Sequence, residues 1–212
     1  MTFTTSLQPY EAGDITLTAS IVHDDDNTPP WERSDGHGPV TAWTSRAKEP
    51  GELVLSKDRG SYRLYDFAEA CKIARRDGWQ PAPYRLDIER GANAQWYIGR
   101  TLHNHTSPWC DDLSACYRAA YAAQAATMSP RALAAKAAYA DFERLRQWCD
   151  DQWSYVGVVV TATHTDTGVK LGNASLWGIE SDAGAYLAET ANDLASEALE
   201  QAAETRAALV QS

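Results

Sequence analysis

Apolar and polar residues alternate along several short segments of the chain, the pattern of strands with one buried face. Between them lie longer segments in which apolar residues recur every three or four positions, as on one side of a helix. Strands are predicted at 14–22, 52–56, 62–65, 153–164 and 169–179. Two hairpins are expected, one across Lys57-Asp58-Arg59-Gly60 and one across Thr165-Asp166-Thr167-Gly168, with a bulge at Gly172-Asn173.

Helical periodicity predicts four helices. Asp66 with Glu69 forms an N-terminal capping box for the first, and Gly78 ends it. Two Ala-rich helices are expected near 112–127 and 130–150, the second beginning at Ser129-Pro130. The last thirty residues read as one long helix. Ser181 is its best cap, although Gly184 favours a start a few residues later.

These elements predict an α+β fold in which an antiparallel sheet of about five strands is packed by helices on one face. We expect a single domain over 1–212, with 84–150 as a helical insertion that carries an Ala-rich helical hairpin. The long polar loop that follows residue 22 is typical of functional loops, and its Trp residues indicate that it is ordered.

Composition and charge narrow the function classes. The net charge of −10 disfavours nucleic acid and anionic membranes as direct partners and favours a basic protein or a metal ion. The four cysteines form no CxxC pair, and the N-terminal residues lack the pattern of a secretory signal. We therefore expect a reduced protein in the cytoplasm.

The C-terminal helix segregates its charges. Seven acidic residues and one basic residue, Arg206, lie between Glu180 and Ser212. The acids predicted to bind a partner share one helical sector: Asp182, Glu189, Asp193, Glu197, Glu200 and Glu204. Like charges at this spacing repel by roughly 0.2–0.5 kcal/mol per pair, so a basic partner is expected. The alternative is a solvated outer face.

Mimicry of nucleic acid is a narrower form of that hypothesis. From Asp182 to Glu204 a helix rises about 33 Å, at ~1.5 Å per residue. The stripe then carries one charge per ~6 Å, whereas a DNA strand carries one per ~3.4 Å. Mimicry would need further acids aligned beside the helix, and Asp24 to Asp26 or Asp150 and Asp151 are the candidates.

Two groups of residues have the chemistry of metal ligands. Carboxylates and imidazoles of the long loop would hold a divalent cation through His23, Asp24, Asp26, Asp35 and His37. The alternative is that these Asp residues only form turns. His103 and His105 lie near Cys110, but the segment lacks a second well-placed thiol, which favours surface histidines.

Other catalytic patterns are missing or weak. The chain has no GxSxG elbow and no phosphate-binding glycine loop. Between Ser175 and Asp182 a strand runs into a helix, and Glu180 and Asp182 oppose anion binding there. Six basic residues could meet an anion or balance the acidic chain: Lys57, Arg59, Arg63, Lys72, Arg75 and Arg76.

Three segments resemble a family of small uncharacterised proteins of tailed phages and prophages. They lie at 23–40, at 58–79 and in the two stretches 153–162 and 175–199, and 84–128 looks like an insertion relative to that pattern. The resemblance implies a phage accessory protein that acts in the host cytoplasm. It transfers no catalytic residue.

The leading hypothesis is therefore a non-enzymatic accessory protein that binds a basic surface of a host protein, as an anti-defence factor or DNA-mimic inhibitor would. A metal-dependent hydrolase or metal-binding protein that uses the 23–40 loop is the rival hypothesis. A homodimer through the Ala-rich helices is the third.

Overall fold

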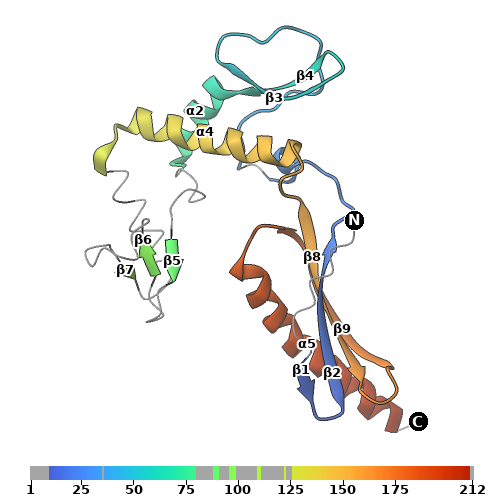
Figure 1. The fold of residues 1–212 in the computed structure, drawn as a ribbon. Coiled ribbons are helices and arrows are strands. Elements are labelled where there is room, and N and C mark those ends of the chain that lie inside the picture. The colour runs from blue at the N-terminus through green and yellow to red at the C-terminus, as the bar shows by residue number, and fades with distance from the viewer. Residues whose placement is uncertain are drawn as a thin grey trace. The chain divides into compact units, whose positions relative to one another are not determined.

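The computed structural model describes residues 10–34, 36–79, 88–90, 96–98, 109–110, 122 and 126–210 (Figure 1). Two compact units make up the chain, one formed by Met1–Thr28 with Asp151–Ser212 and the other by Pro29–Asp150. The single domain with an insertion at 84–150 stays a prediction. Among the described residues, no helix combines the length and the apolar character that a membrane crossing requires.

The first unit is an antiparallel sheet in the order β1-β2-β8-β9, with one long helix along it (Figure 1). Its elements are β1 (Tyr10–Ala12), β2 (Ile15–His23), β8 (Tyr155–His164), β9 (Lys170–Glu180) and α5 (Ala185–Val210). The register aligns Ile15 with His164 and His23 with Val156, so the inward residues of both strands fall on one face. The three strands predicted from alternation in this unit's sequence are confirmed.

The core of this unit lies between that face and α5. Its buried residues are Ile15, Leu17, Val156, Val158, Val160, Ala162, Leu171, Ala174, Ile179, Ala191, Leu194, Ala198 and Ala202. Small residues on both sides bring the helix backbone close to the sheet. A Cβ added at Gly172 would overlap the carbonyl oxygen of Ala198 and lie 2.9 Å from the amide nitrogen of Ala202.

Two irregularities of β9 shape its exposed end. One register shift lies at Leu171, beside the predicted bulge, and the other places Trp177 and Gly178 opposite Gly157. Gly178 has a φ of +76°, a left-handed conformation that glycine adopts without strain. Ser181 is not the cap of α5, because the helix begins only at Ala185 and the Ser181 hydroxyl accepts from the amide of Ser154 instead.

The second unit packs two helices and a hairpin around an Ala-rich core. Its elements are α1 (Pro30–Arg33), β3 (Glu52–Asp58), β4 (Ser61–Asp66), α2 (Phe67–Asp77), the small sheet β5 (Ile88–Arg90), β6 (Trp96–Ile98) and β7 (Trp109–Cys110), and α4 (Pro130–Cys149). Its core consists of Leu55, Tyr65, Ala70, Ala74, Ala134, Ala137, Ala138, Phe142 and Leu145. Most of the predicted helix 112–127 lies outside the described residues.

The α+β class and the antiparallel pairing are confirmed. One sheet of about five strands is not observed, because β3 and β4 form a separate two-stranded sheet that belongs to the second unit. Three alanines of α4, the helix expected to support a dimer, are buried in the core of their own unit: Ala134, Ala137 and Ala138. Leu209, near the end of α5, is 63% exposed.

Candidate functional site

The acidic stripe, defined as Glu189, Asp193, Glu197, Glu200 and Glu204, follows one side of an unbroken helix. All five residues are exposed, and within the part of the chain that the structure describes none of them forms an ion pair. Several carboxylates elsewhere are paired, as Asp14 is with Arg206 at 2.7 Å and Glu69 with Lys72 at 2.7 Å. Asp182 lies before the first residue of α5 and outside the stripe.

The stripe runs beside the outer edge of β9, which pairs with β8 on its other side and with no further described strand. The side-chain oxygen of Gln201 accepts from the amide of Asn173, which therefore points away from β8. The Gln201 amide nitrogen donates to Glu197. Helix α5 thus covers the first half of this edge and places a stripe carboxylate next to it.

Beyond Asn173 the edge is open and carries apolar side chains. Leu176, Trp177 and Tyr186 are 43%, 47% and 52% exposed. A depression of about 420 Å³ lies between residues 176–180 of β9 and Tyr186 of α5. The Trp177 ring covers Gly157, where an added Cβ would overlap it. Neither Leu176 nor Trp177 packs in the core, because both are half-exposed beside the register shift opposite Gly157.

Tyr186 joins the open edge to the acidic stripe. At 100° per residue, Tyr186 falls in the same sector of α5 as Asp193 and Glu204. The surface is therefore continuous, with an apolar patch and free strand edge at one end and a row of carboxylates along the helix. Apolar centres with charged borders are the usual anatomy of protein-binding surfaces.

The predicted metal ligands lie in different surroundings. His23 ends β2, whereas Asp24 and Asp26 accept hydrogen bonds from the amides two residues later, at 3.0 Å each, as turn-forming Asp residues do. Asp35 lies outside the described residues. No three His, Cys, Asp or Glu side chains converge as metal ligands in the described ranges, and His103 and His105 fall outside those ranges. The metal site stays a prediction.

His37 has a different partner from those expected. Its Nδ1 lies 2.6 Å from Oδ1 of Asp141 on α4, and the amide of Gly38 donates to Oδ2 at 2.8 Å. The hydroxyl of Tyr65 also donates to Oδ2, at 2.7 Å. A carboxylate only accepts, so Nδ1 of His37 carries the proton and the ring is fixed in orientation. This network joins the long loop to α4 and β4.

Burial, and next to it the charge of Asp141, raises the pKa of Tyr65 well above its ordinary value. Tyr65 therefore stays protonated and acts as a donor. Asp141 was not predicted from the sequence. The available signal was its position among the buried residues Ala137, Ala138, Phe142 and Leu145, where a carboxylate needs partners.

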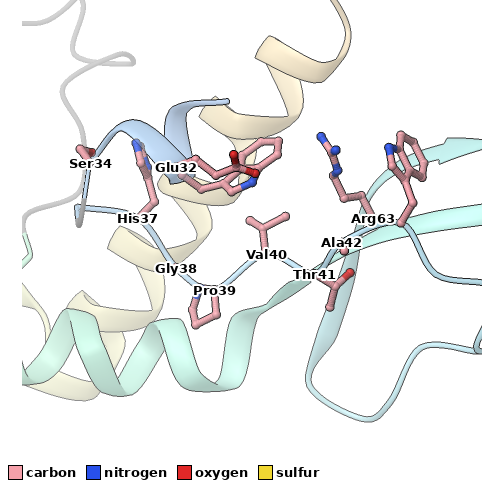
Figure 2. Close-up of a pocket in the computed structure, with 11 residues that line it drawn as sticks. Glu32, Ser34, His37, Gly38, Pro39, Val40, Thr41, Ala42 and Arg63 are labelled. Carbon is pink, nitrogen blue, oxygen red and sulfur yellow. The ribbon is translucent and has the colours of Figure 1, made fainter. Parts of the chain in front are cut away.

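Beside this network lies a cavity of about 560 Å³ between the long loop and the hairpin (Figure 2). His37 lines one end and Arg63 the other, with Val40 between them (Figure 2). Residues 39–44 run antiparallel to β4, through bonds such as Thr41 N–H to Leu64 O at 2.9 Å. This part of the loop is thus held against β4.

The chain matches no protein family model, and no curated protein or solved structure shows significant similarity to it.

Proposed function

We propose that this protein is a non-enzymatic binding protein whose first unit binds an extended, basic segment of a partner protein. The segment would add as a strand to the open edge of β9 and lie against the acidic stripe of α5. The observation that carries the proposal is a row of five exposed carboxylates without ion pairs, beside an unpaired strand edge.

Strand addition fits the geometry of β9. Because the Asn173 amide points away from β8, alternation directs the backbone groups of Ser175 the same way. An added strand gains main-chain hydrogen bonds from such an edge, and pockets beside it select alternate side chains. The depression between Leu176 and Tyr186 would receive an apolar side chain.

Charge determines which segment fits. Lysine or arginine side chains of the added strand would meet the stripe, whereas a second copy of this chain would bring two acidic stripes together. The charge spacing of about 6 Å along the stripe is wider than the spacing of DNA phosphates. This difference favours a basic protein segment as the target over a groove that is shaped to bind DNA. With the phage-type resemblance of the sequence, we propose a basic host protein, such as a defence factor, as the partner.

The probe for this proposal is a fluorescent peptide of alternating lysine and valine, titrated with the intact protein at about 50 and about 300 mM salt. We expect binding that weakens as the salt concentration rises. A triple charge reversal, Glu189→Lys, Asp193→Lys and Glu197→Lys, should weaken binding at low salt by more than about tenfold. Ser175→Pro removes a backbone N–H that points away from β8 and would donate to the added strand. Because this hydrogen bond does not depend on charge, the substitution should weaken binding at both salt concentrations.

The matched control reverses Asp25, Asp58 and Asp166, which are exposed and lie outside the stripe. It changes the net charge by the same amount, so binding should fall by no more than about twofold. Equal loss in both triple variants would overturn the proposal, as would a folded Ser175→Pro protein with unchanged affinity. Leu176→Lys, which repels a basic strand, tests the edge again if the proline variant fails to fold. Absence of peptide binding at low salt would also refute the proposal.

A further inference from the structure

Arg63 occupies an unusual position in the second unit, between two indole rings. Its guanidinium carbon lies 5.0 Å from the ring centre of Trp31 and 5.0 Å from that of Trp43. Trp31 is itself fixed by an edge-to-face contact with Trp148, at 5.5 Å between ring centres. The loop backbone on either side of Trp43 is hydrogen-bonded to β4. The guanidinium is therefore held in one place before any ligand arrives.

Within the described ranges, this guanidinium has no anionic partner. Arg63 forms no ion pair there, and its Nε is buried without a hydrogen-bond partner. Two other basic residues of the predicted anion-binding cluster are paired, Lys72 with Glu69 and Arg76 with Asp77. The remaining three, Lys57, Arg59 and Arg75, are exposed, whereas Arg63 is half-buried. Arg63 is therefore the half-buried arginine of this cluster, and no described carboxylate neutralises it.

The chemistry of this arrangement selects a planar or tetrahedral oxyanion. A guanidinium presents its N–H donors in a fixed fork that matches carboxylate and phosphate oxygens, while its faces stack on aromatic rings. Here both indole rings lie against the guanidinium, and none of its N–H groups has an acceptor among the described residues, so they remain free for a ligand.

The cavity next to Arg63 has room for more than a simple ion. Its volume of about 560 Å³ lies within the range of small-molecule sites. The opposite end is polar, with His37 oriented by Asp141 (Figure 2). Glu32 also lines the cavity, outside ion-pair distance of Arg63, and its charge would oppose an anion.

We infer that this cavity is a binding site for a small organic oxyanion, a carboxylate or a phosphate monoester, which binds to the guanidinium of Arg63 beside Trp31 and Trp43. The site lies wholly in the second unit and is independent of the proposed strand-binding surface.

The test uses the intact protein and three probes: inorganic phosphate, phenyl phosphate and benzoate. Binding is followed by tryptophan fluorescence and by the NMR signals of the Trp43 indole and the Arg63 guanidinium. We expect at least one organic probe to shift both signals with saturation. Arg63→Gln should weaken that probe by at least roughly tenfold, and Arg63→Lys should weaken it as well, because a lysine loses both the fork and the stacking. Glu32→Gln should tighten binding by roughly two- to fivefold, because it removes a like charge.

Arg75→Gln is the matched control, since Arg75 is exposed on α2 and does not line the cavity. It should leave the affinity unchanged. Comparison of phenyl phosphate with benzoate identifies the preferred oxyanion. If none of the probes perturbs the Trp43 and Arg63 signals at millimolar concentration, the inference is wrong. It is also wrong if Arg63→Gln and Arg75→Gln bind alike. If Arg63→Gln fails to fold, Arg63→Lys and Glu32→Gln test the inference instead. Arg63→Lys should weaken binding and Glu32→Gln should tighten it, and any other pair of results would show that the inference is wrong.

Discussion

Asp141 accepts three hydrogen bonds, and Asp141→Ala tests whether they stabilise the second unit. The substitution leaves the Gly38 amide and Nδ1 of His37 without an acceptor, whereas the Tyr65 hydroxyl can donate to the carbonyl oxygen of Ala138, 3.1 Å away. A buried donor left unsatisfied costs about 1–3 kcal/mol. Because the His37 side chain is 22% exposed, water can replace part of its bond. We therefore expect a loss of about 2–4 kcal/mol in the free energy of unfolding.

The assay has to report on the second unit alone, because the chain contains two compact units. Amide hydrogen exchange of Leu64 and of the α4 residues measures its opening free energy directly. Asp141→Asn keeps one acceptor oxygen and should cost less, about 1–2 kcal/mol. Arg131→Ala, at an exposed position of the same helix, is the control and should stay within about 0.5 kcal/mol.

A double-mutant cycle with Asp141→Ala and Tyr65→Phe measures the coupling energy between these two side chains. Since the two side chains are in direct contact, the cycle should give a coupling energy of about 0.5–3 kcal/mol. If Asp141→Ala changes the exchange of the second unit no more than Arg131→Ala does, the network contributes nothing to stability and this account of it is wrong.

Two further predictions concern one ion pair and one close contact. The hydrogen bond from the Arg46 side chain, followed by that from the backbone amide of Glu49, lowers the pKa of Glu52 from 4.5 to about 2. The ionised Glu52 therefore stabilises the folded protein above about pH 4.5, and this stabilisation is lost as the pH falls toward 2. An NMR titration should place the Glu52 carboxyl midpoint near 2 and Arg46→Gln should return it toward 4.5, while a normal wild-type midpoint would contradict this. Gly172→Ala should cost the first unit about 1–3 kcal/mol in urea unfolding, because α5 has to move away; a loss below about 0.5 kcal/mol would show that the contact is loose.

Local signals in the sequence were sufficient to place several elements. The Asp66 side chain accepts from the amide of Glu69, and Gly78 closes α2 in a left-handed conformation, as the capping pattern predicts. Ser129 caps α4 through the amide of Ala132. The turn at Arg59-Gly60 has positive φ at both residues, and the strands beside it pair as expected. These features depend on neighbouring residues only, so a single sequence contains them.

Pairings between distant segments could not be predicted in the same way. Strand β2 pairs with β8, although the whole second unit lies between them in the sequence, whereas β3 pairs with its neighbour in sequence, β4. The alternation of apolar and polar residues is the same in both cases. Asp141 meets His37 because α4 packs beside the long loop, a contact that no local pattern encodes. The exposure of the second half of β9 likewise depends on where α5 begins, and the helix begins at Ala185 and not at the predicted cap Ser181.

The charges of α5 also bear on the exposed edge of β9. An uncovered strand edge with apolar side chains is a site for pairing between identical chains, and proteins commonly block it with charged residues. In β9 the half that contains Asn173 is capped by Gln201, but the half that contains Leu176 and Trp177 is not. Antiparallel pairing of two such edges would place both acidic stripes along the same junction. The carboxylates that would attract a basic strand therefore also oppose self-association, so a single surface would select its partner by charge while its backbone provides the hydrogen bonds.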